Sequence, residues 1–194
     1  KKHEVAVVRH FKRVVPLRHF VYERTRGACT LAELREFKAK RDREIEESDE
    51  LWEPEGPRYD TTTHIDLVDY LSKQRKLPCL YFVFSRRQCE EKAEELGRLV
   101  NYLTVAERNE VLTFFDERID GMNIGSMPSV KRMRKTLERG IAYHHAGLLP
   151  VLKEIVEDLF ERKIVRVLYA TETFAVGINF PVRTVCFDRV RKFN

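Results

Sequence analysis

Hydrophobic and polar positions follow two different periods along most of the chain, and their alternation predicts an α/β fold. Short continuous apolar runs predict buried strands at 79–84, 140–143, 165–170 and 184–187. Apolar residues at helical spacing predict helices at about 63–76, 86–100 and 150–162, with two more inside 104–139. Strands that alternate with helices in this way form an open, mostly parallel sheet flanked by helices.

The first 62 residues have a weaker pattern. Apolar segments at 5–8 and 14–22, the second containing Pro16, predict an extended arm. Thr30 and Glu33 have capping-box spacing, which predicts a charged helix from there to about Glu47. Residues 48–62 have no periodicity and predict a loop. We therefore expect an arm with a charged helical insertion and loop at 1–62, and an α/β domain at 63–194.

Several residues mark where helices begin. Capping-box spacing recurs at 85–88 and 104–107, and Pro150 suits the first position of a helix. Ser129 is predicted as the N-cap of a helix that starts at Val130. No internal repeat or low-complexity tract interrupts the pattern.

Composition limits the class of protein. With 43% hydrophobic residues, the chain has enough apolar surface for a folded core. Its apolar runs are far shorter than a membrane helix, and no signal-peptide core follows Lys1, so we expect a soluble, cytoplasmic protein with no membrane partner. A start at a residue other than Met and an end just after a strand suggest a piece of a longer protein.

The net charge of +5 is unevenly distributed. Residues 1–24 hold seven Lys or Arg against two acidic residues, whereas residues 25–194 hold 29 of each. The basic end is either a nucleic-acid contact or a solvated basic strand, and the sequence leaves both interpretations open.

The cysteines and paired histidines do not have metal-ligand spacing. The four cysteines form no C-x-x-C pair, which predicts reduced, buried thiols. His144 and His145 are adjacent, so their rings should point apart, and no carboxylate cluster is spaced to join them. We expect one ring to pack against neighbouring loops and the other to reach a partner, with no bound metal.

Polar residues and glycines follow three of the predicted strands. They are Ser85 and Arg86, the loop 144–147, and Thr171 with Thr173. The carboxyl ends of parallel strands meet at one edge of a sheet, so these residues should line one groove. Hydroxyls, guanidinium groups and helix-start amides there can hold phosphate.

Each of these residues also has a purely structural interpretation. Ser85 can be a plain helix cap, which is compatible with phosphate binding. Thr171 and Thr173 can likewise be caps, and Gly177 can be a simple helix stop. The sequence contains neither G-x-x-x-x-G-K-[ST] nor G-x-G-x-x-G, so the usual primary nucleotide cradles are absent.

Four segments together resemble motifs of the DExH-box helicases of superfamily 2. The subgroup they resemble is the superkiller-like RNA helicases that feed the exosome, with their bacterial relatives. The similarity extends from about residue 14 to residue 194. The segments are 143–148 (YHHAGL), 170–181 (ATETFAVGINFP), 80–86 (LYFVFSR), similar to motif IV, and 15–20 (VPLRHF), similar to the arm that joins the two motor domains.

The resemblance implies that this chain is the second RecA-like domain, the helicase C-terminal domain, of a two-domain ATP motor. It assigns contacts with single-stranded RNA or DNA to Ser85, Arg86, His145, Gly147, Thr171 and Thr173. It also implies that Gly177 and Asn179 face ATP with Mg²⁺, held mainly by the first RecA-like domain.

Two family elements are missing from this sequence. Neither the phosphate loop nor the Q-x-x-G-R-x-G-R arginine motif is present, so we expect no catalytic residue here and no ATPase activity from this chain alone. The longer protein should hydrolyse ATP and unwind or remodel RNA or DNA. The alternative is a catalytically inactive helicase-like module that binds nucleic acid or protein through its basic arm and the 30–50 helix.

Overall fold

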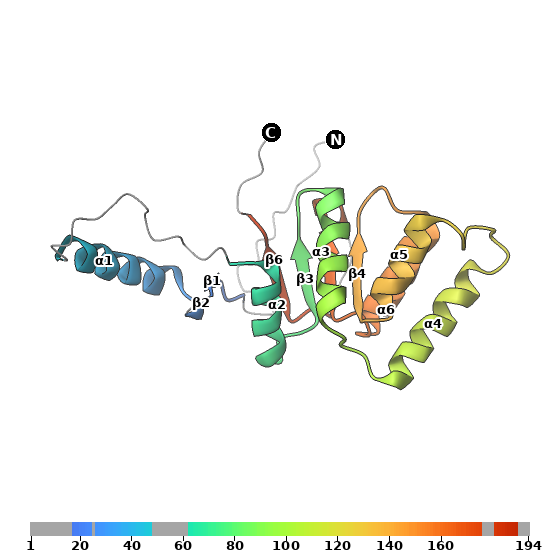
Figure 1. The fold of residues 1–194 in the computed structure, drawn as a ribbon, viewed down its shortest axis with the longest axis horizontal. Helices are drawn as coiled ribbons and strands as arrows, with labels where there is room; N and C mark the ends of the chain where they lie inside the picture. Colours follow the sequence, from blue (N-terminus) through green and yellow to red (C-terminus); the bar gives the residue numbers. More distant parts are fainter. Residues whose placement is uncertain (1–16, 25, 48–61, 176–180, 190–194) are drawn as a thin grey trace, which may run out of the picture. The chain divides into compact units, whose positions relative to one another are not determined.

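A computed structural model describes residues 17–24, 26–47, 62–175 and 181–189. The chain divides into two compact units, residues 1–62 and 63–194 (Figure 1). The extended segment predicted at 5–8 and residues 14–16 of the one predicted at 14–22 lie outside the described residues. Each unit is described by itself below.

The first unit contains a small hairpin followed by a helix. Strand β1 (Val21–Glu23) pairs antiparallel with β2 (Gly27–Cys29), and α1 (Leu31–Glu47) follows. The sequence pattern did not predict β2. Thr30 and Glu33 form the predicted capping box, with the Thr30 amide 2.6 Å from Glu33 Oε2 and the Glu33 amide 3.3 Å from Thr30 Oγ1. The predicted charged helix is therefore confirmed.

The second unit is built on a parallel sheet of four strands. Their order is β4–β5–β3–β6, and every neighbouring pair is parallel. The strands are β3 (Cys79–Phe82), β4 (Ile141–His144), β5 (Val167–Ala170) and β6 (Thr184–Phe187). The predicted α/β class with an open parallel sheet is confirmed.

The helices found among the described residues of this unit flank the sheet on both of its faces (Figure 1). Side chains alternate between the two faces along a strand. Tyr169 of β5 therefore meets His64 on one face, while His144 of β4 contacts Glu157 on the other. The helices are α2 (His64–Lys73), α3 (Arg86–Leu99), α4 (Val105–Ile119), α5 (Pro128–Leu137) and α6 (Pro150–Glu161).

The helix starts follow the predicted capping signals with one exception. Thr104 caps α4 in a complete capping box with Glu107, and Pro150 begins α6. The prediction that Ser129 caps α5 is wrong, since α5 begins at Pro128 with Met127 at its N-cap. Proline has the helical φ already and lacks the N–H that a cap would satisfy, so it takes the first helical position.

The core lies between the sheet and its helices. It includes the aromatic residues Tyr143, Tyr169, Phe115 and Phe160, all at most 1% exposed. All four cysteines are free thiols, and all are buried as predicted. Within the described ranges, no helix is long and apolar enough to cross a bilayer.

Candidate nucleic-acid interface

Three loops meet at the carboxyl ends of the strands, a region that we call the carboxyl rim (residues 83–86, 144–148 and 171–174). The sheet register aligns the last residues of the three strands, Phe82, His144 and Ala170. The Thr171 amide donates to the His144 carbonyl at 3.1 Å, and the Val83 amide donates to the Ala170 carbonyl at 2.9 Å. The three loops are thus joined by backbone hydrogen bonds.

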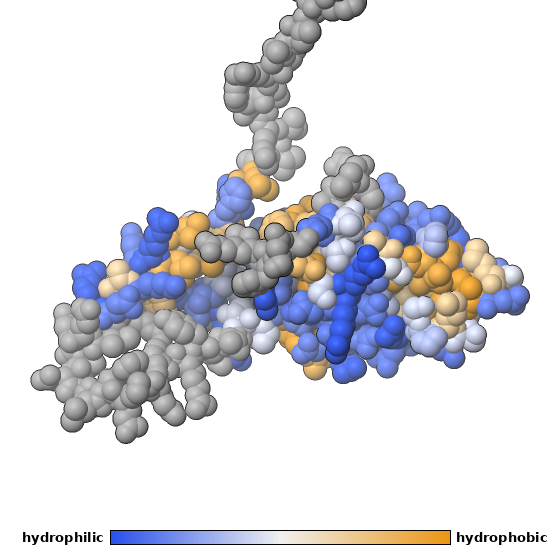
Figure 2. Space-filling view, turned by 90° about the horizontal axis from the view of Figure 1, so that it is seen from above, coloured by the Kyte–Doolittle hydropathy of each residue, from blue (hydrophilic) through white to orange (hydrophobic). Residues whose placement is uncertain are grey.

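All three loops line one small open pocket of about 160 Å³ at this rim. In Figure 1 strands β3 and β4 point upward, so Figure 2 looks onto this end of the sheet, where much of the surface is hydrophilic. The pocket residues are Phe84, Arg86, Ala146, Thr171, Glu172 and Thr173.

Gly147 lies next to Arg86. A Cβ atom built on this glycine would lie 3.5 Å from Arg86 Nη1 and 3.3 Å from His145 Nδ1. Both Gly147 and Arg86 are exposed. The structure therefore brings these two predicted residues together with Thr171 and Thr173 at one edge of the sheet.

Ser85 and the threonines also have local roles. The Ser85 hydroxyl accepts from the Gln88 amide at 3.5 Å, which is one half of the predicted capping box. Thr171 Oγ1 lies 3.0 Å from Thr173 Oγ1. A short 3₁₀ turn (Glu172–Ala175) follows β5. Ser85 starts α3, so the free amides of that helix face the rim.

The two neighbouring histidines contact opposite sides of the sheet, as predicted. His144 Nε2 lies 2.8 Å from Glu157 Oε1 of α6, and its ring packs on Phe174 with centroids 4.5 Å apart. His145 Nε2 lies 3.1 Å from Glu90 Oε1 of α3. Both rings are buried, so the prediction that one of them is free to reach a partner is wrong.

Burial sets the charge of both histidines. Loss of hydration lowers the pKa of His144 and of His145, since burial disfavours the charged imidazolium. The hydrogen bonds that the rings donate to Glu157 and Glu90 raise the two pKa values, but each of these effects is smaller than that of burial. Both rings are therefore neutral at physiological pH.

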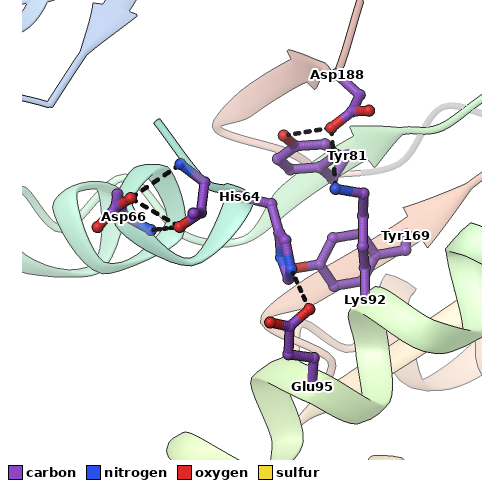
Figure 3. Close-up of polar contacts among 8 residues, drawn as sticks. His64, Asp66, Tyr81, Lys92, Glu95, Tyr169 and Asp188 are labelled. Atoms are coloured by element: carbon purple, nitrogen blue, oxygen red, sulfur yellow. Dashed lines mark hydrogen bonds and ion pairs between the residues drawn. The ribbon is translucent and has the colours of Figure 1, made fainter. Parts of the chain in front are cut away.

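A second polar network, centred on the buried His64, joins α2, α3 and β5 and was not predicted from the sequence (Figure 3). His64 Nε2 lies 3.1 Å from Glu95 Oε2, and His64 Nδ1 lies 2.8 Å from the Tyr169 hydroxyl. A carboxylate only accepts, so the proton sits on Nε2 and Nδ1 accepts from Tyr169. This contact ties the start of α2 to the strand that leads into Thr171.

Asp188 joins the same region from the end of β6 (Figure 3). Its Oδ1 accepts from the Tyr81 hydroxyl at 3.2 Å and lies 3.1 Å from Lys92 Nζ. Burial, with help from Asp188, raises the pKa of Tyr81, so this phenol keeps its proton. A polar residue directly after a strand was the only sequence signal for Asp188.

The remaining predicted site residues are not described by the structure. Gly177 and Asn179 lie outside the described residues. Among the residues that are described, no group of three or more His, Cys, Asp or Glu side chains is arranged to hold a metal ion.

Comparisons with known proteins give the chain's relatives. No protein-family model matches it. It is 33% identical to the human protein "Superkiller complex protein 2" over 99% of the chain and 17% of that relative. It is 43% identical to "Antiviral helicase SKI2" of Saccharomyces cerevisiae over 66% of the chain and 10% of that relative.

A plant relative carries a related name. The chain is 44% identical to "DExH-box ATP-dependent RNA helicase DExH11" of Arabidopsis thaliana, over 66% of the chain and 10% of that relative. The chain therefore spans only 10 to 17% of the length of these three relatives.

The parallel sheet, the helices on both faces and the polar carboxyl rim define a RecA-like domain. Together with the named relatives, they assign the family predicted from the motifs. The chain belongs to the superkiller-like subgroup of the DExH-box helicases.

Proposed function

We propose that this chain is the second RecA-like motor domain of an ATP-dependent RNA helicase, and that its carboxyl rim binds the backbone of single-stranded RNA. The proposal rests on one observation: three separate strand-end loops line the same pocket, to which they contribute Arg86, Ala146 and Thr171 respectively. The names of the relatives as RNA helicases favour RNA over DNA.

The chemistry of the rim suits phosphate. Arg86 supplies a planar guanidinium group, Thr171 and Thr173 supply hydroxyls, and the start of α3 supplies free amides. Since the His145 ring is buried, the exposed residues Ala146 and Gly147 would carry that loop's contact with RNA. Such contacts do not depend on base identity, as a translocating motor requires.

ATP binding would be shared with a first RecA-like domain of the same longer protein. Gly177 and Asn179 would face the nucleotide and its Mg²⁺, which the first domain would hold mainly through its phosphate loop. This sequence contains no such loop, so the chain alone should bind RNA weakly and hydrolyse no ATP.

Replacing Arg86 by alanine tests the proposal. Fluorescence anisotropy with a labelled oligouridylate should show about tenfold weaker binding, because a hydrogen bond to a charged group contributes about 1.5–3 kcal/mol. The slope of log affinity against log salt should fall by about 0.7, the value for one lost phosphate contact on a single strand.

Arg87→Ala is the matched control. Arg87 is the next residue of α3, and its Nε lies 2.6 Å from Glu91 Oε1 rather than at the pocket. This variant should bind RNA as the parent chain does. Equal affinity for all three chains would instead favour the alternative, a helicase-like module that binds through another surface.

A further inference from the structure

The loop after β4 is held from within by one of its own histidines. The Gly147 amide donates to His145 Nδ1 at 3.2 Å. Nδ1 can accept this bond only while it carries no proton, so the neutral ring must carry its proton on Nε2. The shape of the loop at Gly147 therefore depends on a single tautomer of His145.

Glu90 selects that tautomer. Its Oε1 lies 3.1 Å from His145 Nε2, and an ionised carboxylate only accepts hydrogen bonds. The second oxygen of Glu90, Oε2, lies 3.1 Å from Arg132 Nη2 of α5. Glu90 is thus fixed between α5 and the loop, and it fixes the His145 ring, which in turn accepts from the Gly147 amide.

The charges around His145 favour the neutral ring. Its side chain is 4% exposed, and burial is the largest influence on its pKa, which is lowered even though Glu90 acts to raise it. Arg86 and Lys153 also lower the pKa of His145. His144, the adjacent residue, is itself buried and has a lowered pKa. At a pH above the usual histidine range, the neutral His145 ring therefore accepts from the Gly147 amide. We call this arrangement of Glu90, His145 and Gly147 the clamp.

His144 provides a contrast within the same dipeptide. Its Nε2 bonds Glu157, but its Nδ1 has no hydrogen-bond partner among the described residues. The Glu157–His144 pair therefore does not extend to a loop amide, whereas the Glu90–His145 pair does. This difference separates a positioning role from simple burial of a histidine.

We propose that Glu90 is a positioning residue of the carboxyl rim, which holds His145 in the tautomer that accepts from the Gly147 amide and so orders the RNA-binding loop beside Arg86. The RNA part rests on the proposed function. A loop that is ordered before RNA binds does not lose conformational entropy on binding. Ordering the backbone of one residue at that moment would weaken affinity about tenfold.

The experiment uses the whole 194-residue chain labelled with ¹⁵N. In the parent, imidazole ¹⁵N shifts should report a proton on Nε2 of His145, and the Gly147 amide should exchange slowly with solvent. Glu90→Ala should populate the other tautomer, accelerate Gly147 exchange about tenfold, and weaken oligouridylate binding about tenfold. Glu90→Gln should keep the parent tautomer and most of the slow Gly147 exchange and RNA affinity, because the glutamine amide oxygen also accepts from Nε2.

Two control variants isolate the path through His145. Glu157→Ala removes the equivalent carboxylate from His144 and should leave Gly147 exchange unchanged. Arg132→Ala removes the outer partner of Glu90 but keeps the Glu90–His145 bond, so it should have a smaller effect than Glu90→Ala.

The outcomes are distinguishable. Unchanged Gly147 exchange and an unchanged His145 tautomer in Glu90→Ala would overturn the proposal. If Arg86→Ala also leaves RNA binding unchanged, the proposed function fails, while the two NMR readouts still decide the clamp. If Glu90→Ala does not fold, Glu90→Leu decides, because it keeps the bulk of the side chain but has no acceptor: a shift to the other His145 tautomer with faster Gly147 exchange supports the proposal, and a parent-like tautomer with slow exchange overturns it.

Discussion

Buried histidines of the α/β unit each meet a carboxylate that lies far away in the sequence. His64 meets Glu95, His144 meets Glu157, and His145 meets Glu90. An imidazole presents two different atoms, a donor and an acceptor, so each carboxylate also decides what the other nitrogen does. At His64 that nitrogen accepts from Tyr169, and at His145 it accepts from Gly147.

His64→Ala should lower the free energy of unfolding by about 3 kcal/mol. It leaves the buried Tyr169 hydroxyl without a partner, which costs about 1–3 kcal/mol, and adds a cavity. Urea denaturation checks the value. Glu95→Ala is the control, and it should cost less than about 1 kcal/mol because the Glu95 side chain is 58% exposed.

A double-mutant cycle tests whether the His64–Tyr169 bond carries the effect. His64→Ala with Tyr169→Phe should be less destabilising than the sum of the two single variants, with a coupling of about 1 kcal/mol. Strict additivity would show that the two side chains stabilise the fold independently.

Helices of the α/β unit begin at signals that are local in sequence. Two capping boxes, Thr63 with Asp66 in α2 and Thr104 with Glu107 in α4, each use residues three apart. Prolines occupy the first position of the next two helices, Pro128 in α5 and Pro150 in α6. The starts at Thr104 and Pro150 were predicted because these signals involve only residues within one turn, whereas the box at Thr63 and the start at Pro128 were not predicted. The Ser129 prediction failed because a proline next to it competes for the same helix start.

Thr104→Ala should destabilise the chain by about 1 kcal/mol, the usual cost of a lost cap. Here the Thr104 hydroxyl accepts from the Glu107 amide at 3.3 Å, and the Thr104 amide lies 2.8 Å from Glu107 Oε2. Urea midpoints at constant slope give the change. Thr104→Ser keeps the hydroxyl and should stay close to the parent; an equally large loss in both would point to the methyl group instead.

The whole chain should lose stability on mild acidification. Burial lowers the pKa of His64, His144 and His145 below the usual value of 6.5. Between that value and the lowered ones, the unfolded chain binds more protons than the folded chain, so the free energy of unfolding falls as pH falls. Urea midpoints should be constant from pH 8 to 7 and decline below about 6.5.

Carboxylates act in a separate, lower range of pH. Hydrogen bonds from Thr104 lower the pKa of Glu107, and Arg134 lowers that of Asp116, from ordinary values of 4.5 and 3.8. Their contributions are lost only as pH falls below those values. A midpoint that rises between pH 7 and 5.5 would contradict the assignment of neutral, buried histidines.

The sequence alone determined the periodicity of the α/β unit, most of its helix starts, and the motifs of the DExH-box helicases. It also placed Arg86, Gly147 and Thr171 at strand ends, because parallel strands interleaved with helices have one common carboxyl edge. These features depend on residues that are near neighbours along the chain.

Only the tertiary structure decided the strand order β4–β5–β3–β6 and the partners of the buried side chains. Glu90 is 55 residues from His145, and His64 is 105 residues from Tyr169. No local propensity encodes such pairs, since they form only when packing brings α2 and α3 against the sheet. For the same reason, the sequence suggested that one of His144 and His145 reaches a partner, whereas the fold buries both rings.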